Sequence, residues 1–504
     1  MKKRAIINFL ASTVYQISNI LIGLLIPKYY TEIFGSVYNG LNQSVTQIMS
    51  LLSVLQLGIS AAAIQLMFKY IAADDKNMIR AIYRDTGKQY RKMGYVFLAV
   101  VLPIAFCFPF LLKEDLPYNI IVAFLLFRIV SSAMEYFFQA KYNVILIAHN
   151  KSYAIYVINT VLLLISTALH LTVLFTVQNI LLYQAVAVVS TVLRFMIVTV
   201  YIRKKFPFLQ QTTETECAPP KENKRKDVLV SEVAGMIIDS TDMLVLSTFS
   251  GLVSTSIYSV YNFVVAGIGN VMSSCREAVF AGLGKTYYQD FRTFQSKFDG
   301  FESIYLFLAF FLYSVTILLF RPFIEVYTAN MDAQYFYAGF PILFVLCKLL
   351  VNMRIPSIVA INTAGHFKKV KKYAVIEAAL NLGLSLLLVK PLGIYGVLLG
   401  TIIGAAFRTP ILVWYSNKHI VKRTQMAYWK KLLVWLPFFL TAYAVSVLKP
   451  IQCRSLPHWL LTAVSTAGVV LVLAVLWMFV FDRKTFRMLW GILGKVLHRK
   501  EKKE

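Results

Sequence analysis

Long apolar runs, each of 18 or more residues, recur along the whole chain and constrain its fold more than any other feature. A helix needs about 20 apolar residues to cross the roughly 30 Å hydrocarbon core of a bilayer, so each run is long enough to span it. Membrane-spanning strands would appear instead as segments of about 10 residues with alternating polarity. The pattern therefore predicts an all-α, polytopic membrane protein.

The small share of charged residues and the excess of basic ones are also typical of membrane proteins. Of its 504 residues only 15% are charged, whereas soluble domains carry about 25%. Lys and Arg number 51 against 24 Asp and Glu, a formal net charge of +27. The basic residues lie mostly between the apolar runs, where cytoplasmic loops of membrane proteins concentrate them. The charge therefore indicates orientation in a membrane, and no binding to nucleic acid is expected.

The apolar runs predict about fourteen spanning helices. They lie at 5–26, 41–67, 93–112, 119–147, 153–175, 180–201, 229–249, 253–278, 304–320, 337–361, 374–392, 395–416, 432–448 and 458–481. With the N-terminus inside, the inner connecting segments hold most of the Lys and Arg residues, which is the arrangement that the positive-inside rule requires. Both termini are therefore expected to be cytoplasmic.

A polar stretch with two adjacent prolines separates the sixth and seventh runs and is expected to be a flexible linker. The predicted parts are an N-terminal six-helix bundle at 1–202, a cytoplasmic linker at 203–228, a C-terminal six-helix bundle at 229–416, helices thirteen and fourteen at 417–481, and a basic cytoplasmic tail at 482–504. The segments 34–45 and 250–261 are both rich in Gly, Ser and Tyr, which supports an internal duplication. Repeated halves are a common transporter plan.

Polar residues inside the runs are informative, because a charge at mid-bilayer costs about 2.5–3.5 kcal/mol and normally faces protein or water. Six polar residues of the fourth run fall on one side of the predicted helix: Arg128, Ser131, Ser132, Glu135, Gln139 and Tyr142. Arg128 and Glu135 can form a buried ion pair that only joins two helices. Alternatively, the face lines a water-filled cavity, which its length of about 16 Å from Arg128 to Gln139 favours.

Four further runs also carry polar residues on one side. Besides Arg128 and Gln139, the candidate substrate contacts are Arg4, Asn8, Asn19, Asn42, Gln43, Asn262 and Arg276. The candidates for ion coupling or charge pairing are Glu135, Glu232, Asp239 and Asp242. For each uncharged residue alone, hydrogen bonding between helices of a dry bundle is the simpler explanation. Together, the polar faces favour a hydrated interior.

The later runs contribute less to such an interior. Arg354, Glu377 and Arg408 lie in three different runs and are expected to be isolated, with the two arginines able to reach the cytoplasmic surface. The His and Cys residues show no ligand pair or CxxC spacing, and no P-loop, GxSxG or HExxH motif occurs. We therefore expect no catalytic site, no metal site and no cofactor.

Two stretches carry a resemblance to a known family. IPKYYTEIFGSVYNGLNQSVTQIMSLLSVLQLGIS at 26–60 is similar to the polysaccharide-transporter branch of the multidrug/oligosaccharidyl-lipid/polysaccharide (MOP) exporter superfamily, the Wzx-type oligosaccharide flippases. DSTDMLVLSTFSGLVSTSIYSVYNF at 239–263 resembles the start of that family's second half. The resemblance covers the whole predicted layout of helices.

The resemblance implies a function and a location. It implies two six-helix bundles around a V-shaped cavity in a bacterial cytoplasmic membrane, working by alternating access. The implied substrate is an oligosaccharide repeat unit on undecaprenyl pyrophosphate, moved from the inner to the outer leaflet for capsule, exopolysaccharide or a related polymer. Arg4 and Arg276 would contact the pyrophosphate, and helices thirteen and fourteen would form a groove for the lipid tail. Implied partners are membrane lipid, Na⁺ or H⁺, and a polysaccharide polymerase or glycosyltransferase.

Alternatives remain at this point. A cation-coupled multidrug exporter of the MATE type would have twelve helices and an acidic pocket, so the extra helix pair and the intramembrane arginines count against it. A lipid II flippase of the same superfamily is not separated from a capsule or exopolysaccharide flippase by the sequence. A membrane glycosyltransferase or polymerase would need a large outer loop with paired carboxylates or arginines, and none of the predicted loops provides one.

Overall fold

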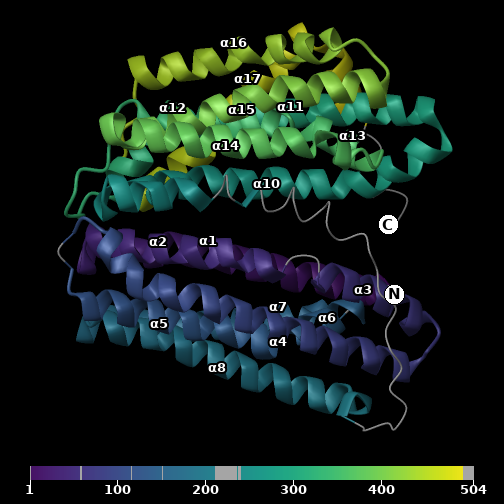
Figure 1. Cartoon of the computed structure of the whole chain (residues 1–504). Helices are drawn as coiled ribbons and strands as arrows, with labels where there is room; N and C mark the ends of the chain where they lie inside the picture. The colour runs from purple at the N-terminus through teal and green to yellow at the C-terminus, as the bar shows by residue number, and fades with distance from the viewer. Residues whose placement is uncertain are drawn as a thin grey trace. The chain divides into compact units, whose positions relative to one another are not determined.

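The computed structural model describes residues 2–56, 59–114, 116–149, 151–210, 235–236 and 240–491. These residues are helical nearly throughout, and none of them forms a strand. Figure 1 shows long helices running side by side within each part of the chain. The prediction of an all-α, multi-pass membrane protein is confirmed.

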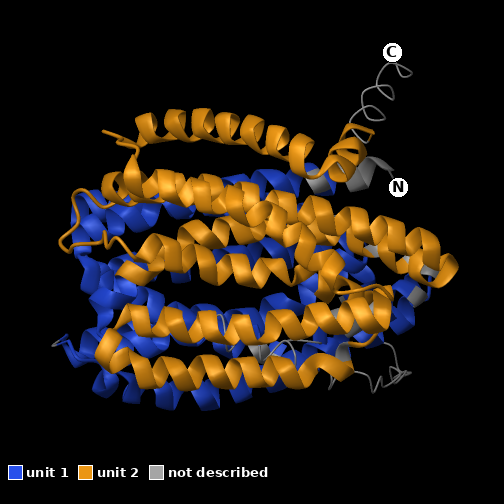
Figure 2. Cartoon of the chain, turned by 90° about the horizontal axis from the view of Figure 1, so that it is seen from above, with its two compact units in different colours: residues 1–256 blue, residues 257–504 orange. Residues whose placement is uncertain are grey.

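The chain forms two compact units, Met1–Ser256 and Ile257–Glu504, which Figure 2 shows in different colours. The boundary falls just after the start of a long helix, so the helical stretch 240–249 belongs to unit 1. The predicted linker at 203–228 lies mostly outside the described residues. The division into a linker and two six-helix bundles therefore stays a prediction.

Unit 1 is built from helices of very different lengths. They are α1 (Lys2–Phe34), α2 (Ser36–Leu52), α3 (Ile59–Ala72), α4 (Lys76–Cys107), α5 (Tyr118–Met134), α6 (Ala140–Ala148), α7 (Ser152–Thr172) and α8 (Ile180–Lys205). A π-helix, η3 (Glu135–Gln139), joins α5 to α6. Side chains fix several helix starts: Asp75 accepts the N–H of Met78 at α4, and Asn179 accepts two N–H groups at α8.

Unit 2 continues from α10 (Leu252–Gln289), whose first residues belong to unit 1. The other helices are α11 (Phe291–Tyr327), α12 (Phe340–Met353), α13 (Ile355–Thr363), α14 (Phe367–Leu392), α15 (Ile394–Ser416), α16 (Met426–Leu448) and α17 (Leu456–Phe481). A further helical stretch covers 483–491. Asp290 ends the turn between α10 and α11, where its carboxylate accepts the N–H groups of Arg292 and Thr293.

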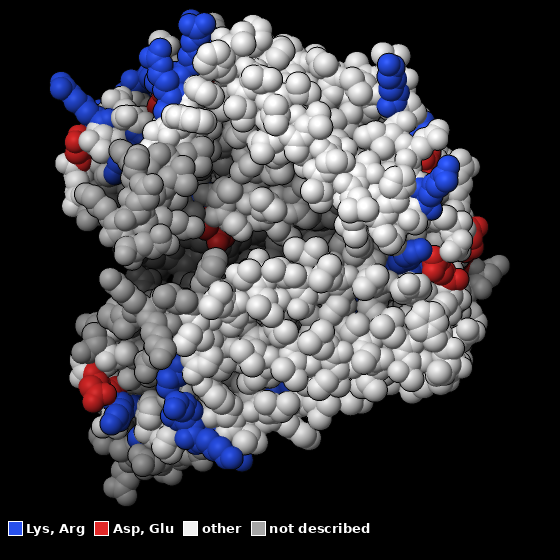
Figure 3. All heavy atoms as spheres, turned by 180° about the vertical axis from the view of Figure 1, so that it is seen from behind, with Lys and Arg blue, Asp and Glu red and all other residues white. Residues whose placement is uncertain are grey.

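Within the described residues, 12 helical segments are long and apolar enough to cross a membrane. Each corresponds to one predicted run, and the other two predicted spans, 41–67 and 229–249, contain residues outside the description. The predicted count of fourteen therefore stays a prediction. Figure 3 shows Lys, Arg, Asp and Glu gathered toward the two ends of the helices in each unit, with a mostly uncharged band between them. This is the surface that a bilayer requires.

The core of unit 2 is centred on α11. In the membrane-spanning part of this helix, 72% of the residues are buried. It packs against α12, α16 and α17. In contrast, only 17% of the residues in the membrane-spanning part of α16, and likewise of α17, are buried. These last two helices therefore present most of their apolar surface outward, as lipid-facing helices do.

Candidate functional site

Arg128 occupies the interior of unit 1, on α5. It lies ten residues after the first residue of this helix, which is about 15 Å into a membrane-spanning segment. Its Nη2 donates a hydrogen bond to Oδ1 of Asn42 on α2 at 2.8 Å. Its Nε is buried without a hydrogen-bond partner, and no carboxylate in the described part of the chain pairs with it. The predicted substrate contacts Arg128 and Asn42 are thus brought together.

Three aromatic side chains from other helices surround this arginine. The rings of Tyr30 on α1 and Tyr183 on α8 lie 5.0 Å apart, and the ring of His170 on α7 lies 4.2 Å from Tyr183. The Arg128 guanidinium interacts electrostatically with all three. Five helices therefore converge on one cation, and the groups that they bring to it are neutral and polar.

An intramembrane guanidinium without a carboxylate is costly. A charge that is taken out of water without an opposite charge beside it is unfavourable, because attraction to a partner does not offset the desolvation penalty. Asn42 and the surrounding hydroxyl groups offset part of this penalty, but they bring no negative charge. The charge of Arg128 is therefore compensated only in part by the groups that surround it.

The ion pair between Arg128 and Glu135 that the sequence left open does not form, since no ion pair involving either residue occurs among the described residues. Glu135 is the first residue of the π-helix η3 and is partly buried. It lies seven residues beyond Arg128, or about 10 Å along the helix. Single π turns inside α-helices frequently occur at functional sites.

The π-helix also divides the predicted polar face, because its extra residue changes the helical register. Gln139 is only 3% exposed and donates from Nε2 to the carbonyl of Thr191 on α8 at 3.4 Å. Tyr142 is likewise buried, and its hydroxyl accepts a hydrogen bond from Thr199. The face therefore stays partly exposed only as far as Glu135, and Gln139 is placed in helix packing.

Four other candidate residues of unit 1 lie within the described residues. Asn8 accepts the N–H of Tyr153 at 2.8 Å, which joins α1 to α7. Asn19 is exposed and donates to the carbonyl of Tyr15 on its own helix at 2.9 Å. Gln43 is partly buried beside Asn42 on α2, and Asp242 is buried. Three other predicted residues lie outside what is described: the side chain of Arg4, and Glu232 and Asp239 entirely.

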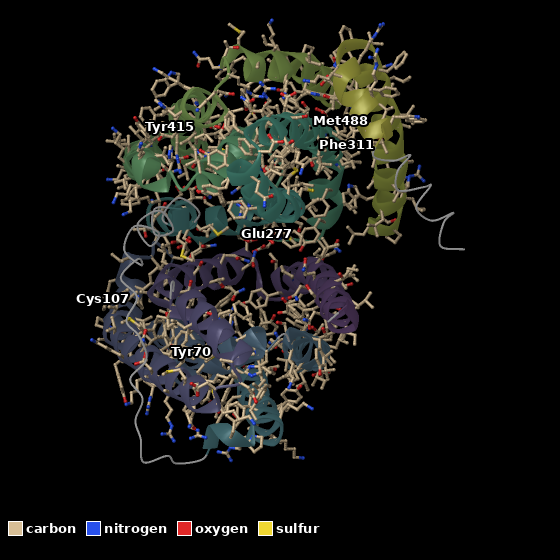
Figure 4. All side chains as sticks on the ribbon, turned by 90° about the vertical axis from the view of Figure 1, so that its right-hand side faces the viewer. Tyr70, Cys107, Glu277, Phe311, Tyr415 and Met488 are labelled. Carbon is tan, nitrogen blue, oxygen red and sulfur yellow. The ribbon has the colours of Figure 1, made fainter. Side chains whose placement is uncertain are left out.

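In unit 2, the predicted contacts Asn262 and Arg276 both lie on α10. Asn262 is partly buried. Arg276 is 38% exposed and lies 3.8 Å from the carboxylate of its neighbour Glu277, which is itself 75% exposed. Figure 4 shows Glu277 extending from α10. An exposed pair at this distance contributes little, so Arg276 is available to another anion.

Sequence reasoning missed a second intramembrane arginine in unit 1. Arg194 on α8 is partly buried, and no hydrogen bond or ion pair of its side chain occurs in the described ranges. It lies eleven residues after Tyr183, so both fall on the same side of the helix about 16 Å apart. The spacing of Tyr183, Thr191 and Arg194 was the signal available in the sequence.

The expected isolation of the later charged residues is wrong. Glu377 on α14 accepts a hydrogen bond from Arg354 at 2.6 Å and another from Arg408 on α15 at 2.7 Å. Glu377 is 1% exposed, so the three residues form a buried triad. Both arginines are therefore held by Glu377, with side chains that are 6% exposed at Arg354 and 15% exposed at Arg408.

Close packing of α14 and α15 explains why the triad forms. Gly396, Gly400 and Gly404 line one side of α15 at four-residue spacing. A Cβ added to Gly396 would lie 2.2 Å from the carbonyl oxygen of Leu388, so no other residue fits there. Small residues at this spacing let two helix backbones approach closely. This approach brings Arg408 within reach of Glu377.

A second charged cluster, called here the five-charge cluster, joins one end of α11 to α16. It consists of Asp299, Glu302, Arg423, Lys431 and Lys484. The helical stretch 483–491 contributes Lys484, and its Met488 lies against Gly300 of α11, on the same side of unit 2 as Phe311 in Figure 4. Each charge of the cluster has a partner within it, so we interpret the cluster as structural.

An apolar groove of 650 Å³ runs between α16 and α17. Its lining includes Phe438 and Val445 of α16 and Val469 and Trp477 of α17. Among the described residues, no group of three or more His, Cys, Asp or Glu side chains is placed to hold a metal ion.

The sequence profile of the polysaccharide biosynthesis protein family matches residues 6–283, more than half of the chain. The chain belongs to this family. The resemblance predicted from 26–60 and 239–263 is thereby confirmed. No curated protein sequence matches the chain.

Solved structures agree with the family at the level of fold. The chain is similar to the lipid II flippase MurJ in an inward closed conformation, with 16% identity, a TM-score of 0.65, and coverage of 94% of this chain and 99% of that one. It is also similar to an inward-facing MATE family multidrug resistance transporter of the MOP superfamily, with 11% identity, a TM-score of 0.63, and coverage of 84% and 99%. A MATE structure in complex with MaL6 gives 12% identity, a TM-score of 0.57, and coverage of 84% and 97%. The chain thus has the fold of the MOP transporters.

Proposed function

We propose that the chain is a flippase that moves undecaprenyl-pyrophosphate-linked oligosaccharide from the inner to the outer leaflet of a bacterial cytoplasmic membrane. The observation that carries the proposal is Arg128, a membrane-embedded guanidinium with a buried, unpartnered Nε and no carboxylate partner in the described chain. Membership of the polysaccharide biosynthesis family and the MOP transporter fold support it. The transport follows an alternating-access cycle.

The chemistry around Arg128 suits a phosphorylated sugar. A guanidinium stays charged in the membrane and binds two phosphate oxygens at once. Its neighbours Asn42, Tyr30 and Tyr183 offer amide and hydroxyl groups that exchange hydrogen bonds with sugar hydroxyls. Because these neighbours carry no charge, they do not compete with the pyrophosphate for the arginine. Arg276 and Arg4 are further candidate contacts within this proposal.

The energy source in this proposal is the electrical potential across the membrane. An inside-negative potential favours outward movement of an anion by about 2.3 kcal/mol per charge per 100 mV. Glu135, which forms no ion pair in the described residues, and the buried Asp242 are the carboxylates that we assign to Na⁺ or H⁺ coupling, with Glu232 and Asp239 of the same predicted set. No ATP-binding motif occurs in the sequence.

The lipid tail in this proposal lies in the groove between α16 and α17, whose lining is nearly all apolar. The orientation has both termini and the 203–228 linker in the cytoplasm, which places the connection between α16 and α17 outside. The released product is then available to a polysaccharide polymerase or a glycosyltransferase that works on the outer face.

The main alternative is a MATE-like exporter of cationic drugs, whose fold the chain shares. The intramembrane charge of unit 1 disfavours it, because Arg128 would repel a cationic substrate. A lipid II flippase would use the same arginine chemistry as an oligosaccharide flippase. The identity of the lipid that accumulates when transport stops distinguishes these two.

The test uses cells in which this chain is the sole flippase for their surface polysaccharide. We expect Arg128→Gln to abolish polysaccharide export and to trap lipid-linked oligosaccharide inside, while Arg128→Lys retains part of the activity because it keeps the charge. Arg292→Gln, at an exposed arginine of α11, is the matched control and exports normally. Membrane abundance and thermal stability are measured for each variant. Unimpaired export by Arg128→Gln would refute the proposal, and mass spectrometry of the trapped lipid separates lipid II from an oligosaccharide carrier.

A further inference from the structure

Two cavities of unit 2 meet at Ile451, in the connection between α16 and α17. One is the apolar groove of 650 Å³ described above. The other has a volume of 820 Å³ and lies where α11 approaches this connection, with Arg321, Glu325 and Arg454 in its lining. Ile451 lines both cavities, so an apolar channel opens directly beside a charged pocket. This arrangement fits an amphiphile with one charged end.

The charged pocket carries excess positive charge. Arg321 pairs with Glu325 at 2.8 Å, and their side chains are 45% and 40% exposed. Arg454 is exposed, and no hydrogen bond or ion pair of its side chain occurs in the described chain. Glu325 is the single acidic residue in the lining of this pocket. An exposed salt bridge contributes only about 0–1 kcal/mol, so a phosphate group can compete with Glu325 for Arg321.

The length of the groove identifies the kind of chain that it accommodates. Its lining on α17 runs from Ser465 to Phe481, which corresponds to about 24 Å of helix. This length exceeds half of the roughly 30 Å hydrocarbon core, to which a phospholipid acyl chain is confined by its own leaflet. A chain that fills the groove therefore crosses the midplane, as a long polyprenyl chain can and an acyl chain does not.

Resting on the flippase function proposed above, we propose that the pocket lined by Arg321 and Arg454 binds the pyrophosphate of the polyprenyl carrier after translocation. The prenyl chain then occupies the groove between α16 and α17, and the sugar extends into the outer aqueous phase. This assigns a release-side phosphate site to unit 2, separate from Arg128 in unit 1. Arginine suits such a site because its planar group binds phosphate in a bidentate manner.

The test measures binding to the purified full chain in phosphatidylcholine nanodiscs by native mass spectrometry. The probe is undecaprenyl pyrophosphate without sugar. We expect the variant Arg321→Gln/Arg454→Gln to bind it about tenfold more weakly or worse, through loss of charge-assisted hydrogen bonds. The matched control, Arg292→Gln/Lys297→Gln, removes two exposed cations near the opposite end of α11 and leaves binding unchanged. Undecaprenol, which lacks phosphate, should bind the wild type and both variants equally.

Two results would overturn this proposal. One is equal binding of undecaprenyl pyrophosphate by the wild type and Arg321→Gln/Arg454→Gln. The other is displacement of the probe by phosphatidylglycerol at equal concentration, which would make the pocket a surface for phospholipid headgroups. Farnesyl pyrophosphate, whose chain is too short for the groove, should bind more weakly than the undecaprenyl probe. Failure of the flippase function is scored separately, by export from cells carrying Arg128→Gln, a variant that the binding measurement does not use.

Discussion

The carboxylate of Glu114 accepts a hydrogen bond from the backbone N–H of Leu252, the first residue of α10. The preceding residue, Lys113, donates to the carbonyl of Phe249 at the end of the helical stretch 240–249. A carboxylate at a helix N-terminus and an ammonium at a C-terminus both complement the helix dipole. Two adjacent loop residues thus hold the turn at 249–252 from both sides. Gly251 makes this turn possible with a φ of 99°.

Gly40 of α2 lies against the same turn, and its substitution tests how tight this contact is. A Cβ at Gly40 would lie 1.9 Å from the carbonyl oxygen of Leu252, so Gly40→Ala must displace backbone. We expect a loss of stability of about 1–3 kcal/mol, measured as a lower midpoint of thermal unfolding in detergent. Gly267→Ala on α10 is the control, since its Cβ meets nothing within 4 Å. An equal midpoint for Gly40→Ala and the wild type would contradict this contact.

A disulfide between α2 and α10 tests whether this contact opens during transport. Asn39 donates from Nδ2 to Oγ of Ser256 at 2.7 Å, and both residues are buried. If the contact opens in each cycle, oxidising the pair Asn39→Cys/Ser256→Cys, in a background without the native cysteines, should stop export, and a reductant should restore it. The matched pair Asn381→Cys/Thr401→Cys replaces another 2.7 Å contact, within unit 2, and should export normally when oxidised. Normal export with a fully oxidised 39–256 disulfide would show that the contact stays closed.

The buried triad predicts a contrast between two glutamates. Glu377→Gln removes the carboxylate that pairs with both Arg354 and Arg408, and breaking a buried ion pair costs about 3–5 kcal/mol. Glu135→Gln removes a carboxylate that forms no ion pair in the described chain, so it should change stability by no more than about 0.5 kcal/mol. Thermal unfolding of the two purified variants measures the difference. Similar midpoints would mean that the triad contributes no net stability.

Much of the fold was predictable because its signals are local. Each apolar run predicts a helix independently of the rest of the chain. All 12 spanning segments of the described residues lie where a run was predicted. Arg128 was predictable for the same reason, since a charge inside an apolar run is visible in the sequence alone. Its partner Asn42 was predicted as a polar position, but the contact between them depends on how α2 packs against α5.

The triad and the broken polar face were not predictable because they depend on packing. Arg354, Glu377 and Arg408 are far apart in sequence, and they meet only because the glycines of α15 let its backbone approach α14. Similarly, the π-helix at Glu135–Gln139 changes the register in the middle of a helix. A regular helix with 100° per residue would place Gln139 on the face of Arg128, whereas the structure places it against Thr191.

His149 predicts how stability depends on pH. It lies just outside the span that ends at Ala148, with its ring 4.8 Å from that of Phe206. Burial lowers the pKa of His149 below its ordinary value of 6.5. The hydrogen bond to the Ile145 carbonyl acts in the opposite direction, and the positive charge of Lys151 lowers the pKa further. The unfolded chain therefore takes up this proton at a higher pH than the folded chain does, so stability falls as the pH drops through 6.5. His149→Gln should unfold at the wild-type midpoint at pH 8 and above it at pH 5, and a constant difference across this range would contradict the assignment.

Arg194 provides a final prediction, which separates a role in transport from a role in folding. It lies on the same side of α8 as Tyr183, with no ion pair in the described residues, and about 16 Å further along the helix. If unit 1 carries the pyrophosphate past both arginines, Arg194→Gln should lower export while leaving the midpoint of thermal unfolding unchanged. Arg194→Lys should recover part of the export because it restores the positive charge. Removing an arginine that only packs with its aliphatic stem would instead lower the midpoint in both variants. Export at the wild-type rate by Arg194→Gln would limit the anion path in unit 1 to Arg128.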